Sequence, residues 1–154
     1  MKLKLIIIGI IFILITINFS GCNDKNNFNE DDEQFSYWLT ITDGIISNLT
    51  NLTFNDLQNK SSDLFLQNLG LFKYRITNYL NDIHRFNISY KYKQIKEIYN
   101  LGLINLSNAL LLIEPYLNED NEYLLTLIDD YFSNYYIHRE EALSLYIELN
   151  GKEW

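Results

Sequence analysis

The stretch FLQNLGLFKYRITNYLNDIHRF, residues 65–86, carries an apolar or aromatic side chain at every third or fourth position. Such spacing puts these side chains on one face of an α-helix, because about 3.6 residues make one helical turn. The face consists of Phe65, Leu69, Phe72, Ile76, Tyr79, Ile83 and Phe86, and Leu57 and Leu64 extend it toward the N-terminus. We therefore predict a long amphipathic helix over residues 56–86.

The same periodicity recurs in three other segments and predicts helices over residues 31–54, 89–114 and 120–149. We expect Pro115 to end the helix over 89–114 and Asn150-Gly151 to end the last one. The apolar faces are Phe35, Trp38, Thr42, Ile45, Leu49 and Leu52; then Tyr92, Ile95, Tyr99, Gly102, Leu106, Ala109 and Ile113; then Leu124, Ile128, Tyr131, Tyr135, His138, Ala142, Leu145 and Leu149.

Short links between long amphipathic helices force neighbouring helices to run antiparallel. The predicted fold is all-α, an antiparallel up-down-up-down four-helix bundle over residues 34–154. The alternative is a helical hairpin that completes its core by dimerising, since heptad spacing suits both arrangements. We expect a monomer rather than a dimer.

The N-terminal segment is unlike the rest of the chain. Lys2 and Lys4 precede an uncharged, mostly apolar run over residues 5–17, which is short for a membrane-spanning helix of roughly 20 residues. The small residues Ser20 and Gly21 then lead to Cys22, the single Cys of the chain. This order is typical of a signal peptide over residues 1–21.

The box Phe19-Ser20-Gly21-Cys22 resembles that of prokaryotic lipoprotein signals, although the bacterial box usually has Leu where Phe19 stands. The resemblance implies that Cys22 carries a lipid and becomes the first residue after cleavage. It also implies a protein held by a lipid anchor on the extracytoplasmic face of the cell membrane. An uncleaved anchor in which Cys22 has no role is the alternative.

Composition limits the remaining classes of function. Loss of residues 1–21 would remove Lys2 and Lys4 from the 12 basic residues and leave all 20 acidic ones, a net charge of −10. This charge makes nucleic acid a poor partner. Residues 22–33 are polar and acidic, which predicts a flexible tether between the anchor and the bundle.

An up-down topology returns the link between the second and third helices to the end at which the first helix begins. Basic residues cluster at this link, and three of them fall where the helix dipole disfavours positive charge. We interpret Arg85, Lys91, Lys93 and Lys96 as a basic rim that contacts anionic lipid head groups. Neutralisation by the acidic tether at the same end is the alternative interpretation.

Gly44, Gly70 and Gly102 each lie near the middle of a predicted helix, where Gly costs stability. At the same height the last helix carries Tyr135, Tyr136 and His138. The glycines either make room for aromatic rings or open a ligand pocket lined by Gly44, Gly70, Gly102, Tyr135 and His138. We expect His138 to be buried, neutral and bonded to a Tyr hydroxyl.

We identify no motif for catalysis or for a cofactor, and the predicted heights of His84 and His138 are too far apart for a shared metal. We therefore expect no enzyme, no metal and no cofactor. Exported chains can be glycosylated at exposed Asn-x-Ser/Thr motifs. The candidates are Asn48, Asn51, Asn59 and Asn87, whereas Asn105 adjoins the core position Leu106.

Two classes of function fit these features. The first is a lipid-anchored surface protein whose bundle is an interaction or spacer module, with a surface protein as its partner. The second is a sensory or carrier bundle that binds a small ligand at mid-height.

Overall fold

The structure, a computed structural model, describes residues 30–55, 63–119 and 121–154. These residues form four α-helices, α2 (Glu30–Asn55), α3 (Asp63–Asp82), α4 (Tyr90–Glu119) and α5 (Glu122–Asn150), with a 3₁₀ turn, η2 (Ile83–Arg85), after α3. None of the described helices is long and apolar enough to cross a membrane.

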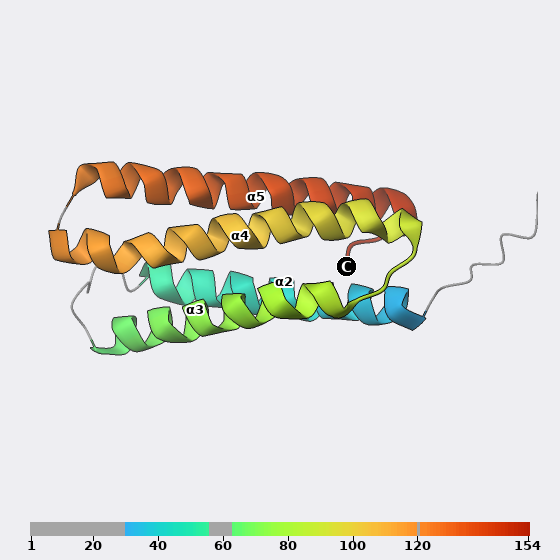
Figure 1. The fold of residues 1–154 in the computed structure, drawn as a ribbon, viewed down its shortest axis with the longest axis horizontal. Coiled ribbons are helices and arrows are strands. Elements are labelled where there is room, and N and C mark those ends of the chain that lie inside the picture. The colour runs from blue at the N-terminus through green and yellow to red at the C-terminus, as the bar shows by residue number, and fades with distance from the viewer. Residues whose placement is uncertain (1–29, 56–62, 120) are drawn as a thin grey trace, which may run out of the picture.

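The four helices form an antiparallel bundle with up-down-up-down topology, which confirms the predicted fold class (Figure 1). Helices α2 and α3 lie side by side as one layer, and α4 and α5 form the other. The start of α2, the link over residues 83–89 and the end of α5 therefore lie at one end of the molecule, which we call the tether end. The link between α4 and α5 lies at the opposite, distal end.

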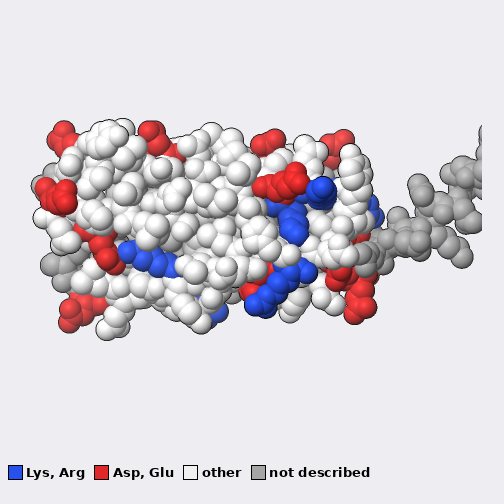
Figure 2. Space-filling view, viewed as in Figure 1, with Lys and Arg blue, Asp and Glu red and all other residues white. Residues whose placement is uncertain are grey.

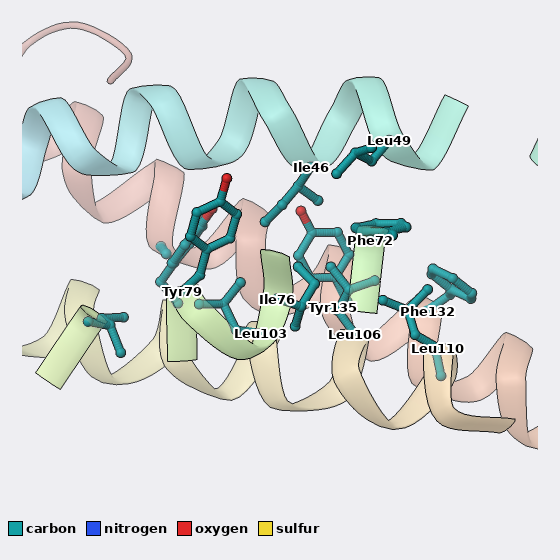
Figure 3. Packing of buried hydrophobic residues seen from close by; sticks show 14 of the residues in the cluster. Ile46, Leu49, Phe72, Ile76, Tyr79, Leu103, Leu106, Leu110, Phe132 and Tyr135 are labelled. Atoms are coloured by element: carbon teal, nitrogen blue, oxygen red, sulfur yellow. The ribbon is translucent and has the colours of Figure 1, made fainter. Parts of the chain in front are cut away.

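All four helices send apolar side chains into a common core (Figure 3). Every predicted core position of α4 is buried, and so are the predicted positions of α3 from Phe65 to Tyr79 and Ile83 of η2. The expectations for Leu64 and Leu149 are wrong, because these side chains are 59% and 38% exposed. Leu52 and Leu57 lie outside the described side chains. The core also includes positions beside the predicted faces, namely Leu39, Ile46, Leu103, Leu110, Phe132 and Tyr146.

The prediction that Pro115 ends its helix is also wrong, because α4 continues through Pro115 to Glu119. Proline removes one backbone donor and strains the preceding turn. Tyr116 and Leu117 pack against the core in the following turn. Burial of these two side chains offsets the cost of the proline, so tertiary packing overrides the local preference.

Helix α5 ends at Asn150-Gly151 as predicted, and a side-chain cap that was not predicted fixes its start. The side chain of Asn121 accepts a hydrogen bond of 3.0 Å from the backbone N–H of Tyr123 and caps the start of the helix. Gly151 ends α5 with a φ of 71°, a left-handed conformation that favours glycine, and its N–H donates to the carbonyl of Ile147 at 2.7 Å. The chain then returns over the bundle, where Trp154 packs edge-on against Tyr99 and Tyr146.

Candidate functional site

A pocket of about 320 Å³ lies at the tether end, between the link over residues 83–89 and the first turns of α4. Lys93 and Lys96 of α4 line it together with His84 of the link. Glu97 adds one acidic group, and Asn100 contributes an amide whose buried oxygen makes no hydrogen bond within the described residues. The two lysines give the pocket positive charge, which suits an anionic group of small size, whereas the Asn100 oxygen is an acceptor that requires a donor.

The four basic residues predicted as a rim lie in the link after α3 and the first turns of α4, at the tether end. Figure 2 shows Lys and Arg side chains gathered toward this end of the face in view. The lysines in the first turn of α4 lie at the positive end of the helix dipole. This turn contains no acidic residue that would offset their charge. Arg85 pairs with Asp82 at 3.1 Å, and Lys96 donates to the carbonyl of Phe86 at 2.7 Å. Lys91 lies 5.4 Å from the ring centre of Tyr92. Lys93 and Lys96 are thus the members of the rim that face the pocket.

Acidic residues occupy the same end, because the first turn of α2 consists of Glu30, Asp31, Asp32 and Glu33. Asp32 is fully buried, and its Oδ1 accepts a hydrogen bond of 2.8 Å from the backbone N–H of Ser89. This bond fastens the start of α2 to the link that precedes α4. The pocket is therefore held in place by contacts between elements that are distant in the sequence.

The mid-height ligand pocket predicted from the three glycines does not form as expected. Gly44 and Gly70 are exposed, and a Cβ added to either would meet no atom within 4 Å. Gly102 alone is buried at a helix contact, where an added Cβ would lie 3.4 Å from the Cβ of His138 and 3.6 Å from the ring of Tyr135. Gly102 therefore permits close approach of α4 and α5, while Gly44 and Gly70 face outward.

His138 also differs from expectation. Its side chain is 28% exposed, and its buried Nδ1 makes no hydrogen bond within the described residues. The nearest carboxylate oxygen belongs to Glu141, 3.9 Å away on the same helix. No described Tyr hydroxyl therefore bonds this nitrogen.

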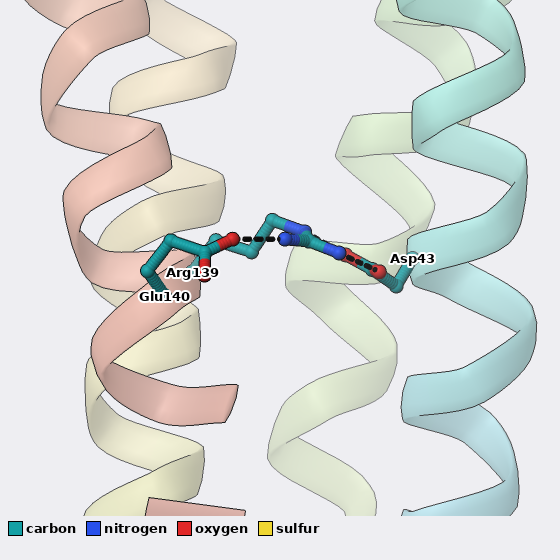
Figure 4. Close-up of polar contacts among 3 residues, drawn as sticks. All are labelled: Asp43, Arg139 and Glu140. Atoms are coloured by element: carbon teal, nitrogen blue, oxygen red, sulfur yellow. Dashed lines mark hydrogen bonds and ion pairs between the residues drawn. The ribbon is translucent and has the colours of Figure 1, made fainter. Parts of the chain in front are cut away.

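An ion pair between α2 and α5 lies close to this height and was not predicted (Figure 4). The guanidinium of Arg139 donates to both carboxylate oxygens of Asp43, at 2.7 Å from Nε and 2.6 Å from Nη2. Arg139 also pairs with Glu140 on its outer side. Hydrogen bonding to Asp43 raises the pKa of the Arg139 guanidinium above its ordinary value. The pair joins the two layers of the bundle.

Several polar atoms in the core have no hydrogen-bond partner among the described residues. They include the hydroxyls of Tyr79 and Tyr99, the indole nitrogen of Trp38 and the hydroxyl of Thr42. Burial raises the pKa of the Tyr99 hydroxyl well above its ordinary value, and the neighbouring Tyr135 and Asp43 raise it further. Burial likewise raises the pKa of the Tyr135 hydroxyl. These hydroxyls therefore remain neutral donors in the folded chain at ordinary pH.

The other candidates have less to support them. Asn48, Asn51 and Asn87 are exposed, whereas the side-chain amide of Asn105 donates to the carbonyl of Leu101 at 2.9 Å. Cys22 and Asn59 lie outside the described residues. Within residues 30–55, 63–119 and 121–154, no three His, Cys, Asp or Glu side chains come together in a group able to hold a metal ion.

Comparison with known proteins adds no relative, because no family, curated protein or solved structure matches the chain.

The Asp43 and Arg139 pair predicts a measurable coupling in stability. Arg139→Ala should lower the free energy of unfolding by about 3 kcal/mol, because it leaves the Asp43 carboxylate buried without its partner. The double variant Asp43→Leu/Arg139→Met should recover most of this loss, because it removes both charges and keeps the packing. Urea denaturation followed by circular dichroism measures both. An equal loss in the two variants would show that the pair is not coupled.

Proposed function

We propose that the chain is a lipid-anchored protein of a prokaryotic cell surface, and that its bundle is a non-catalytic interaction or spacer module beside the membrane. The anchor rests on the sequence, in which one Cys occurs and it follows the small residues of a lipoprotein box. The observation that carries the module's orientation is that α2 begins at the same end of the bundle as the basic pocket.

The length of the segment before α2 limits how far the bundle lies from the membrane. From Cys22 to Glu30 the chain advances eight residues, which can span at most about 29 Å when fully extended. Helix α4 has 30 residues, so the distal end lies a further 45 Å or so along the axis. A lipid on Cys22 therefore keeps the tether end within reach of the head groups.

The basic pocket gives this end a chemistry that suits an anionic membrane surface. Each Lys or Arg close to such a surface contributes up to about 1 kcal/mol of attraction. Lys93 and Lys96 line the pocket, and their positions at the start of α4 bring no benefit to the helix itself. We propose that they contact anionic head groups while Glu30 and Glu33, the exposed acidic side chains in the first turn of α2, face the solvent between the bundle and the membrane.

A small-ligand carrier or sensor is the second candidate, and the unpartnered polar atoms of the core favour it. Buried hydroxyl groups normally have hydrogen-bond partners, and a bound polar molecule would supply them. Tyr79, Tyr99 and Trp38 come from three helices and surround one part of the core. This site lies among the aromatic rings rather than at the three glycines.

The anchor predicts the mass and the location of the native protein. Mass spectrometry of protein extracted from membranes should show the loss of residues 1–21 and the added mass of a lipid. Cys22→Ser should release the protein into the medium, because no acyl chain then holds it. A native chain that begins at Met1 with an unmodified thiol would refute the anchor and the orientation that depends on it.

Head-group contact predicts charge-dependent vesicle binding by the lipid-free chain from residue 22 with Cys22→Ser. It should float with vesicles that contain anionic lipid at low salt, and Lys93→Gln/Lys96→Gln should reduce binding about tenfold. Lys73→Gln is the matched control, because Lys73 pairs with Glu114 toward the distal end. Equal binding by the double variant and the control would exclude head-group contact through the pocket.

Removal of the Tyr99 hydroxyl distinguishes the two candidate functions, because each predicts a different change in stability. In a dry core Tyr99→Phe should raise the free energy of unfolding by about 1 kcal/mol, because it removes a buried group with no partner. If a polar ligand occupies the core, the same change should lower stability and abolish any thermal shift by that ligand. A thermal-shift screen of the wild type and Tyr99→Phe against polar metabolites decides between them.

A further inference from the structure

The outer face of α4 is uncharged over the middle of the helix. The sequence has no charged residue between Glu97 and Glu114. Within this part Leu101, Ile104 and Leu111 point outward, with exposed fractions of 48%, 41% and 58%. Figure 2 shows a broad surface free of charged side chains between the charged groups toward the two ends. Such a face is unusual for a helix whose opposite side already fills the core.

The three exposed residues form a second packing stripe together with the half-buried Asn108 and Pro115. Leu101, Ile104, Asn108, Leu111 and Pro115 follow one another at intervals of 3, 4, 3 and 4 residues. This is the heptad spacing that packs one helix against another, and the face formed by Leu106, Ala109 and Ile113 uses the same spacing inside the bundle. Helix α4 therefore has two packing faces, and no element among the described residues covers the outer one.

We propose that a second copy of the chain covers this face. The two α4 helices run antiparallel, and the two-fold axis that relates them crosses the outer face at the height of residue 106. An isologous pair requires that the same face complement itself after a half-turn. The half-turn brings Leu101 opposite Leu111 of the second copy and Ile104 opposite Asn108. The symmetry repeats the pair of Leu101 with Leu111, so that one such pair lies on each side of the axis, and no charge is buried in the centre.

Charge complementarity decides the direction of the pair. Lys93 and Glu119 flank the stripe at its two ends, and both are exposed. In the antiparallel pair Lys93 lies opposite Glu119 of the second copy, so two ion pairs form at the rim. In the dimer Lys96 is then the pocket lysine that is left to contact head groups. A parallel pair would instead set Lys93 against Lys93. A contact with an apolar centre and a charged rim is typical of protein interfaces.

This dimer differs from the hairpin dimer considered from the sequence, because each copy keeps its own closed core. The partner of the proposed interaction module would then be a second copy of the chain, and only this assignment rests on the proposed function. If both copies are anchored, their tethers leave from opposite ends of the dimer, so the dimer lies along the membrane. The α4 contact itself does not depend on the lipid.

The test uses the full chain extracted from membranes in mild detergent, with its protein mass measured by light scattering after gel filtration. The wild type should be a dimer. Leu101→Glu should raise the dimer dissociation constant at least about 100-fold, because symmetry puts the change in the contact twice. Leu71→Glu is the matched control, since Leu71 is 45% exposed on α3 and should leave the dimer unchanged. Circular dichroism checks that each variant keeps its helices.

Charge exchange tests the antiparallel direction. Lys93→Glu and Glu119→Lys should each weaken the dimer about fivefold at low salt, and the double variant should restore it. The proposal is overturned by a monomer at concentrations up to about 100 µM. It is also overturned by a dimer that Leu101→Glu does not weaken, by failure of the double variant to restore it, or by a different protein occupying this face. A chain that dimerises but carries no lipid would refute the anchor and leave the contact intact.

Discussion

The rotation of α4 about its own axis determines the other features of this protein. Tyr92, Ile95, Tyr99 and Leu106 are almost completely excluded from solvent, so the helix cannot turn without exposing large apolar side chains. Gly102 adds to this constraint, because it lets α4 approach His138 and Tyr135 of α5 closely. With the inner face held in this way, the lysines and the uncharged outer stripe have fixed directions.

The short links between helices decide which charged residues share an end of the bundle. The link over residues 83–89 brings the start of α4 back beside the start of α2, and the bond from Ser89 to Asp32 fastens the two. Positive charge on α4 therefore lies close to negative charge on α2, with a pocket between the link and α4. A similar bond fastens the end of α5, where the hydroxyl of Tyr92 donates to Asn150 at 2.6 Å.

The pattern of apolar residues predicted much of the fold, and it failed where neighbours in space outweigh neighbours in sequence. Pro115 is a local signal for a helix end, but Tyr116 and Leu117 gain enough from burial to extend α4 beyond it. The three mid-helix glycines look equivalent in the sequence, yet only Gly102 lies at a helix contact. Asp43 and Arg139 each follow a predicted core position by one residue, which was the available hint of their pairing across the bundle.

The sequence by itself determined the all-α class, the four amphipathic segments and the end of α5 at Gly151, because these depend on helical periodicity and local backbone chemistry. The tertiary structure alone decided which polar groups meet. The ion pair of Asp43 with Arg139, the ring contacts of Trp38 with Tyr79 and Tyr99, and the pocket beside Lys93 each bring together residues from different elements. Their contacts depend on how far each helix is rotated and shifted against its neighbours, which the packing of the core sets and the apolar pattern does not specify.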